Sequence, residues 1–284
     1  MKTTLLKHFN KFSIVVIIHF LVHNVCYVKL MISFSEIEFI KKTIVLAGKK
    51  ALDFQKEDLK IEFKEDQSPL TNADLVSNEI IVSNLKSKFN SIPIISEENK
   101  NRIVSDIFFL IDPLDGTKEF IKGSGEFTVN IALIKNKKPC FGFVYIPRLN
   151  KIFWNDKNKS FVEINKKKKV IKCRNCFKVL DIEVSKSHID EKTEKFIQSI
   201  KSGKIRRSGS SLKICNIAEG KSNIYPRFGK TMEWDIAAGH SILKKARGEI
   251  FSLSLLPLTY GKENFFNESF IAIGGREIPK MIIK

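Results

Sequence analysis

The sequence predicts a mixed α/β (α+β) protein whose two halves meet near residue 170. Three observations support this. A chain of 284 residues with 43% hydrophobic and 28% charged residues is ordinary for a globular protein and can bury one large core or two modest ones. Residues 35–170 read as two amphipathic helices followed by a series of strands. After residue 170, strand and helix patterns alternate, with no internal repeat and no low-complexity linker.

The net charge of +18 is unusually high. Such a field attracts polyanions or small phosphorylated molecules, although a solvated lysine surface is the simpler interpretation. The Lys166–Lys169 run lacks interleaved aromatic residues, so we expect no specific nucleic-acid partner.

The five cysteines show no disulfide framework, and Cys173 and Cys176 form a lone C-x-x-C without a histidine pair. We therefore expect reduced thiols and a cytoplasmic location.

Residues 1–30 differ from the rest of the chain, because they hold four lysines and no acidic residue. Their apolar run, Phe12–Val28, is shorter than the ~20 clean apolar residues of a spanning helix. It also lacks a small-residue cleavage site. Three interpretations stay open: a start codon placed upstream of the natural one at Met31, a membrane-associating or signal-like segment, and a transit peptide. The second would place the protein peripherally on the cytoplasmic face of the inner membrane.

Two helices are predicted at the start of the body. Ser35 and Glu38 have capping-box spacing, and apolar residues then recur at steps of three and four up to Phe54. A polar turn over residues 66–71 leads to a second helix, with Asp74 in its first turn. The helix dipole favours a carboxylate there, so capping alone would explain Asp74.

Strands follow these helices. Ile92–Ser96 is a short apolar strand that ends in Glu97 and Glu98, and only one of these two can face a given site because strand side chains alternate. Five apolar residues, Ile107–Ile111, predict a strand buried on both faces. An antiparallel meander is expected over Phe127–Leu133, Phe141–Ile146, Ile152–Trp154 and Phe161–Ile164, with Lys166–Lys169 as a hairpin tip or exit.

The stretch Asp112-Pro-Leu-Asp-Gly-Thr117 concentrates the chemistry of this half. Pro113 biases Asp112 toward an extended conformation, Gly116 permits a sharp turn, and Thr117 suits the N-cap of a following helix. Two carboxylates thus lie at a strand end, beside N–H groups that open a helix. The carboxylates suit a divalent cation and the N–H groups suit a phosphate. An ordinary strand–turn–helix corner with solvated aspartates is the alternative.

The second half alternates strands and helices. Strands are predicted over Val179–Ser185, Asn223–Arg227, Ile250–Ser252 and Phe270–Ile273. Helices are predicted over Glu191–Ile200, from Gly209–Lys213 to Glu219, and from Trp234 to Arg247, where Gly248 ends the last one.

Five carboxylates stand at the ends of these elements: Asp74, Glu97, Asp112, Asp115 and Asp235. Gathered at one place they would repel one another unless cations lay between them. Only His188 and His240 occur in the body, which excludes a histidine-rich zinc centre, and neither a nucleophile-elbow nor a P-loop motif is present. Oxygen-only ligation indicates magnesium, and two such ions suit the hydrolysis of a phosphate ester.

The motif Asp112–Thr117, with Trp234-Asp235 and Ala237-Ala-Gly239, resembles the paired signatures of the inositol monophosphatase superfamily. Further stretches resemble its CysQ type, the 3′(2′),5′-bisphosphate nucleotidases: Ser68-Pro69, Ser96-Glu-Glu98, Asp112–Ile134, Gly209–Lys213 and Tyr225–Gly229. The resemblance covers residues 33–275. It implies a layered αβαβα sandwich, a metal-binding subdomain over residues 31–170, a substrate subdomain over 171–284 and an active site between them. A monomer or weak homodimer is expected.

The resemblance also implies site residues. Two or three magnesium ions would be held by Glu97 (rather than Glu98), Asp112, the carbonyl of Leu114, Asp115 and Asp235. Asp74 and Thr117 would orient the attacking water, with Glu97 as a further catalytic residue. The N–H groups of Gly116 and Thr117 would hold the scissile phosphate.

Substrate choice is expected to rest on the second half. Arg227 stands where inositol-directed members carry an acid, and its guanidinium suits a second phosphate. Ser210 and Lys213 occupy nucleotide-binding positions, and His188 lies where the family contacts adenosine, although a loop histidine without a ligand is the alternative. Other substrate contacts are expected from Glu97, Leu114, Asp115, Gly116, Thr117 and Asp235.

The resemblance implies magnesium-dependent removal of the 3′-phosphate of adenosine 3′,5′-bisphosphate in sulfur metabolism. Lithium sensitivity and acceptance of 3′-phosphoadenosine 5′-phosphosulfate are typical of the family. The alternatives are an inositol or sugar phosphatase and, in a different class, an inactive basic protein that binds nucleic acid or membrane.

Overall fold

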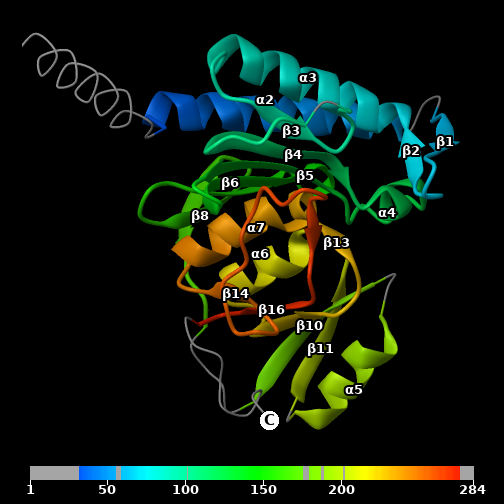
Figure 1. Cartoon of the computed structure of the whole chain (residues 1–284), viewed down its shortest axis with the longest axis vertical. Helices are drawn as coiled ribbons and strands as arrows, with labels where there is room; N and C mark the ends of the chain where they lie inside the picture. The colour runs from blue at the N-terminus through cyan, green and yellow to red at the C-terminus, as the bar shows by residue number, and fades with distance from the viewer. Residues whose placement is uncertain are drawn as a thin grey trace, which may run out of the picture. The chain divides into compact units, whose positions relative to one another are not determined.

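The computed structural model describes residues 32–55, 59–100, 102–174, 179–186, 189–200 and 202–275. The expectations for residues 1–30 and for His188 lie outside these residues. From Glu38 onward, the elements stack in five layers: a pair of helices, a seven-stranded sheet, a second pair of helices, a five-stranded sheet, and a single helix (Figure 1). This is the expected αβαβα sandwich.

The seven-stranded sheet has the order β3-β4-β5-β6-β7-β8-β9. Its strands are β3 (Ile94–Ser96), β4 (Ile107–Asp115), β5 (Thr128–Lys135), β6 (Lys138–Ile146), β7 (Lys151–Asn155), β8 (Ser160–Ile164) and β9 (Lys167–Ile171). Only β3 and β4 pair in parallel, and every later pair is antiparallel. Of the lysine run expected at a hairpin tip or exit, Lys166 lies in the turn between β8 and β9, and Lys167–Lys169 form most of the edge strand β9, where all three are exposed.

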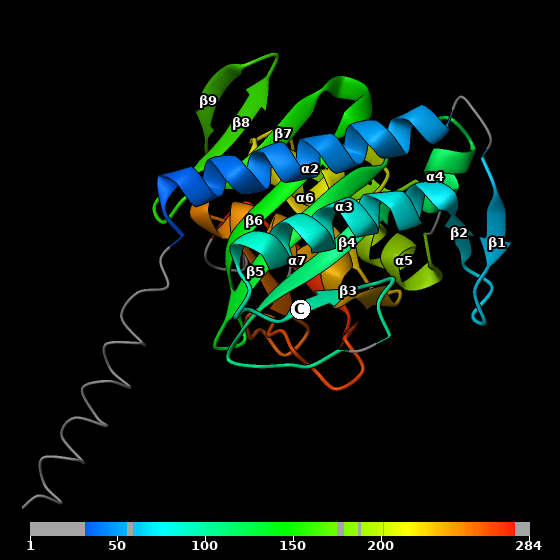
Figure 2. The ribbon, with the colours of Figure 1, turned by 90° about the horizontal axis from the view of Figure 1, so that it is seen from above.

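Helices α2 (Phe34–Phe54) and α3 (Asn72–Lys88) cross one face of this sheet (Figure 2). The capping box of α2 lies two residues earlier than predicted, because Ser33 and Glu36 make it: the Ser33 N–H donates to Glu36 Oε2 at 2.7 Å and the Glu36 N–H donates to Ser33 Oγ at 3.3 Å. Gly48 lets α2 approach closely, since a Cβ there would lie 2.6 Å from the Tyr145 ring.

The five-stranded sheet has the order β11-β10-β12-β16-β14. Its strands are β10 (Leu180–Ser185), β11 (Ser202–Ser208), β12 (Ile224–Arg227), β14 (Glu249–Ser252) and β16 (Phe270–Ile273). Strand β11 was not predicted, since its sequence Ser-Gly-Lys-Ile-Arg-Arg-Ser has no apolar alternation and it pairs at a sheet edge. Helix α5 (Glu191–Ser199) lies on the outer face (Figure 1).

Helices α6 (Leu212–Ala218) and α7 (Glu233–Lys245) lie between the two sheets, and one hydrophobic cluster joins them to both. Helix α7 touches strand β6 backbone to backbone, because a Cβ on Gly142 would lie 2.1 Å from the Ala238 carbonyl oxygen. The expected division into subdomains near residue 170 stays a prediction. Among the described residues, no helix is both long enough and apolar enough to cross a bilayer.

Candidate active site

The junction of β4 and helix α4 (Thr117–Ile121) forms the acidic end of the site. Strand β4 continues beyond the predicted Ile111 to Asp115, and its pairing with β5 is irregular between Asp112 and Asp115. Gly116, with φ 91°, occupies the N-cap that was predicted for Thr117, and Thr117 is instead the first helical residue. The left-handed conformation explains the correction, because glycine adopts it without strain.

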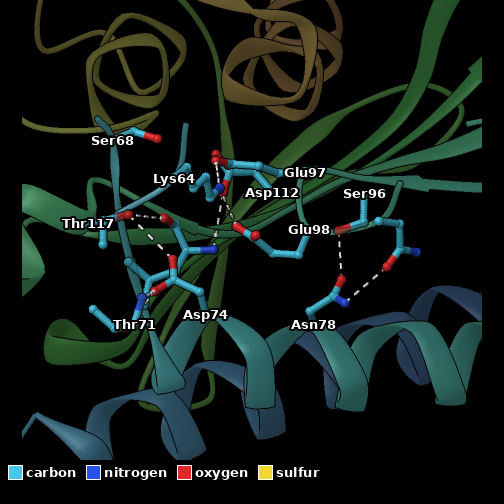
Figure 3. A network of polar contacts seen from close by, with 12 residues as sticks. Lys64, Ser68, Thr71, Asp74, Asn78, Ser96, Glu97, Glu98, Asp112 and Thr117 are labelled. Carbon is cyan, nitrogen blue, oxygen red and sulfur yellow. Dashed lines mark hydrogen bonds and ion pairs between the residues drawn. The ribbon is translucent and has the colours of Figure 1, made fainter. Parts of the chain in front are cut away.

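Asp74 meets this corner from the first turn of α3. Its Oδ2 accepts hydrogen bonds from the Thr71 N–H at 2.7 Å and the Thr71 hydroxyl at 2.5 Å, which closes a capping box. The Thr117 hydroxyl lies 3.4 Å from Asp74 Oδ1 and 3.3 Å from the Leu114 carbonyl, and it has one proton to donate (Figure 3). Burial raises the pKa of Asp74 to about 6.

Lys64 is a site residue that sequence reasoning missed. It follows β1 (Ile61–Phe63), which pairs with β2 (Pro69–Thr71), and its Nζ bridges Glu97 Oε1 at 2.6 Å and Glu98 Oε1 at 2.8 Å (Figure 3). Although burial opposes it, the charge of Glu97 raises the pKa of Lys64. Burial and the Glu97 charge raise the pKa of Glu98 to about 7. In a chain rich in lysine, no local signal marked this one.

Asp115 links the junction of β4 and α4 to the second half of the chain. Its Oδ2 accepts from the Ser211 N–H at 2.7 Å and from Asn130 Nδ2 at 3.2 Å. The Ser211 hydroxyl donates to the Asp235 carbonyl at 2.5 Å, and Asp235 Oδ2 accepts from the Met232 N–H at 2.8 Å at the start of α7. Ser211 and Asn130 were not predicted, since only tertiary contacts reveal them.

Three aspartates, Asp112, Asp115 and Asp235, lie in a shared low-dielectric environment. Burial raises the pKa of each carboxyl. The Glu97 and Asp115 charges raise the pKa of Asp112 further, whereas Lys213 lowers the pKa of Asp115. Within the described parts of the chain, no group of three or more acidic, histidine or cysteine side chains is arranged to bind a metal ion without side-chain movement. Glu97, Asp115 and Asp235 are each held by the protein donors named above.

The site opens into a cavity of about 340 Å³. Ten of the predicted residues line it: Glu97, Asp112, Leu114, Asp115, Gly116, Thr117, Ser210, Lys213, Arg227 and Asp235. Asp74 is not part of the lining and lies behind Thr117. His188 lies outside the described residues, so its predicted contact stays a prediction.

The cationic end of the cavity comes from α6 and β12. Lys213 is 7% exposed, and its Nζ donates to the Ser210 carbonyl at 2.6 Å. Burial lowers the pKa of Lys213, while Asp115 acts in the opposite direction. Arg227 Nη2 donates to the Lys230 carbonyl at 3.2 Å, which holds the guanidinium at the cavity wall. Acidic side chains from β4 and α7 and basic side chains from α6 and β12 thus line one cavity, and the Lys213 ammonium acts directly on the Asp115 carboxylate.

A model of the inositol monophosphatase family matches residues 35–280. The chain belongs to this family. It is 40% identical over 212 residues to the 3′(2′),5′-bisphosphate nucleotidase CysQ of Shigella flexneri, across 73% of this chain and 86% of that protein. The CysQ nucleotidase of Buchnera aphidicola is 39% identical over 223 residues, across 75% and 83% of the two chains.

Solved structures of the family share this fold. CysQ from Bacteroides thetaiotaomicron superposes with a TM-score of 0.75 at 37% identity, covering 86% of this chain and 98% of that one. An inositol monophosphatase from Thermotoga maritima gives a TM-score of 0.75 at 24% identity and supports the fold alone. Members of the family are phosphatases that generally use divalent metal ions, and this chain is accordingly an enzyme of the phosphatase class.

Proposed function

We propose that this protein is a magnesium-dependent phosphatase that converts adenosine 3′,5′-bisphosphate and water to AMP and phosphate. One observation carries the proposal: a single cavity is lined by the buried Asp112, by the partly buried Glu97, Asp115 and Asp235, and by the cations of Lys213 and Arg227. A substrate with two phosphates needs both features, one for hydrolysis and one for recognition. The similarity to CysQ nucleotidases supports this choice of substrate.

The donor set fits magnesium. Glu97, Asp112, the Leu114 carbonyl, Asp115 and Asp235 offer only oxygen atoms, which hard divalent cations prefer. Burial and mutual repulsion raise the pKa of Asp112 and of Asp235, so bound cations would relieve an unfavourable accumulation of charge. When bound, two or three magnesium ions would acidify the attacking water and neutralise the charge of the phosphate.

The chain's own residues would orient that water. If the Thr117 hydroxyl donates its hydrogen bond to Asp74 Oδ1, its lone pairs are left to accept a hydrogen bond from water on the cavity side. The capping box fixes Asp74 from behind through its other oxygen. Asp74 and Thr117 would therefore set the direction of attack.

The opening of α4 would hold the phosphate under attack. The N–H groups of Gly116 and Thr117 lie at a helix N-terminus beside the aspartates, where anions are favoured. In the same cavity, the buried ammonium of Lys213 and the guanidinium fork of Arg227 would bind the 5′-phosphate, with Ser210 also in the lining.

The deciding experiment measures magnesium-dependent phosphate release from adenosine 3′,5′-bisphosphate and from inositol 1-phosphate. We expect the bisphosphate to be the better substrate. Asp112→Asn should lower kcat at least about 100-fold, because it removes one buried carboxylate charge. Asp53→Asn is the matched control, since Asp53 is exposed on α2. Full activity of Asp112→Asn would contradict the metal assignment, and a preference for inositol 1-phosphate would contradict the substrate.

A further inference from the structure

A second cavity of about 350 Å³ lies between α2 and the strands β6–β8. It shares no lining residue with the active-site cavity and is of comparable size. That volume falls within the usual range of small-molecule sites. Its lining comes from one face of α2, from the neighbouring strands and from the turn between β8 and β9.

Lysines dominate this second cavity. Four lysines and only two glutamates line it, so positive charge is in excess: Lys41, Lys42, Lys49, Lys166, Glu38 and Glu163. Both glutamates are already engaged, because Lys41 Nζ lies 2.9 Å from Glu38 Oε1 and 3.0 Å from Glu163 Oε2. The buried Lys41 offsets one of these two negative charges, so the four lysines and two glutamates together leave a net charge of +2 on the cavity wall.

The other three lysines have no acidic partner within 4 Å among the described residues. Lys42 and Lys49 are seven positions apart on α2 and therefore lie on the same face of the helix. Lys166 approaches from the β8–β9 turn. Lys42, Lys49 and Lys166 are exposed and thus border the cavity from two separate elements, where an anion entering from solvent can reach them.

Neutral donors complete the wall. The buried Tyr145 hydroxyl donates to Asn150 Oδ1 at 3.0 Å, and Asn150 Nδ2 donates one N–H to Asn165 Oδ1 at 3.4 Å. The hydroxyl lone pairs and the second Asn150 N–H are left for further hydrogen bonds. Lys41 also lies 4.1 Å from the centre of the Trp154 ring, so Trp154 is close enough to report on the electrostatics of the cavity.

We propose that this second cavity binds a small polyanion that carries phosphate or sulfate groups, through Lys42, Lys49 and Lys166. The site is separate from the proposed phosphatase chemistry. A compact ligand matches the volume, and a multivalent anion matches the three cations that lack acidic partners.

The two tryptophans of the chain permit a local test. In a Trp234→Phe protein, Trp154 is the only indole, so its fluorescence reports on the second cavity. Inorganic tripolyphosphate is titrated at constant ionic strength without magnesium. We expect a saturable change in fluorescence, and Lys42→Gln/Lys166→Gln should weaken the affinity at least about tenfold by removing two charge-assisted contacts.

Lys86→Gln/Lys88→Gln is the matched control, because both lysines are exposed at the end of α3 and have no ion pair among the described residues. It should bind within about twofold of the parent. The proposal fails if no saturable change occurs, or if both double variants bind equally. It also fails if Arg227→Gln, which alters the active-site cavity, abolishes the signal. Unchanged thermal unfolding of each variant shows that folding is intact.

Discussion

Asp74 uses its two carboxylate oxygens for different purposes, one for the α3 cap and one for Thr117. Asp74→Asn keeps an acceptor at the cap but removes the charge. We expect kcat to fall at least about 100-fold while the free energy of unfolding changes by less than about 1 kcal/mol. Kinetics and urea unfolding check this. Thr71→Ala should do the reverse, costing about 1 kcal/mol of stability with little loss of kcat. If both variants lost kcat and stability to the same extent, the two oxygens of Asp74 would not have separate roles.

Lys64 acts as a cation within the acidic wall. Lys64→Met removes it and leaves Glu97 beside Glu98 without a partner. We expect lower thermal stability in EDTA and a several-fold lower magnesium concentration for half-maximal activity, because the competing positive charge is gone. Lys60→Met, at an exposed position four residues earlier, should change neither property. An unchanged magnesium requirement in Lys64→Met would contradict competition at Glu97.

Arg227 tests substrate recognition separately from chemistry. Arg227→Met should raise KM for adenosine 3′,5′-bisphosphate at least about tenfold, since a bidentate phosphate contact is lost. The kinetics of inositol 1-phosphate, which has a single phosphate, should stay nearly constant. Steady-state measurements with both substrates check this, and an equal loss for both would assign Arg227 a structural role instead.

The residues that could be predicted are those with local signals. Asp112, Asp115 and Gly116 follow from the end of a strand and a turn, and they line the cavity together. Lys64 and Ser211 could not be predicted, because their roles depend on contacts with residues 33 and 96 positions away. No local pattern pairs Asp74 with Thr117, 43 positions on, but the family resemblance predicted that these two residues act together.

At the scale of elements, α7 is positioned by the absence of a side chain on β6. A Cβ at Gly142 would lie 2.1 Å from the Ala238 oxygen and 2.9 Å from its carbonyl carbon, and backbone atoms cannot move aside locally. Gly142→Ala should cost roughly 2 kcal/mol of unfolding free energy or more, and should lower activity because α7 carries Asp235.

Urea unfolding and phosphate release check this prediction. Gly274→Ala is the control, since a Cβ there meets its neighbours only at ordinary contact distances of 3.4 Å and more. Equal stability of the two variants would show that the β6–α7 contact tolerates an added carbon.

The long helix α2 could be predicted well from its periodic apolar residues, whereas α3 was predicted from the polar turn before it and two pairs of apolar residues. Strand β11 could not, because its side chains are polar and its pairing with β10 comes from tertiary structure. The position of the α2 cap was also wrong, because Ser33 and Ser35 offer similar local signals and only the folded helix distinguishes them.

For the whole molecule, a buried pair between α7 and β14 links stability to pH. His240 Nδ1 lies 2.7 Å from the Tyr260 hydroxyl, and its Nε2 hydrogen-bonds with Glu249. Burial lowers the pKa of His240, which favours a neutral ring that donates to Glu249. Although burial opposes it, that hydrogen bond, together with the nearby Lys244 ammonium and the Ile250 N–H, lowers the pKa of Glu249 from 4.5 to about 2.

A carboxylate whose pKa is lower in the folded protein stabilises the fold at pH values above its pKa in the unfolded chain. For Glu249, this stabilisation is lost as the pH falls from 4.5 toward 2. Glu249→Gln should therefore be less stable than the parent at pH 7 by roughly 3 kcal/mol. This difference in unfolding free energy should narrow by pH 3, because the parent loses part of the stabilisation from its Glu249 carboxylate there. Urea unfolding of both proteins at pH 7 and at pH 3 checks this. If the difference in unfolding free energy is the same at both pH values, the ionisation of Glu249 is not its source.

The hydrophobic cluster that joins both sheets through α6 and α7 has a consequence for synthesis of the chain. Strands β3–β9 and the Asp112–Thr117 corner leave the ribosome first, but Asp235 and the strands behind it come from the last quarter of the sequence. In a nascent chain, four of the five site carboxylates are therefore synthesised well before Asp235 and the second sheet, which complete the site. Catalytic competence should arise in one step, near the end of translation.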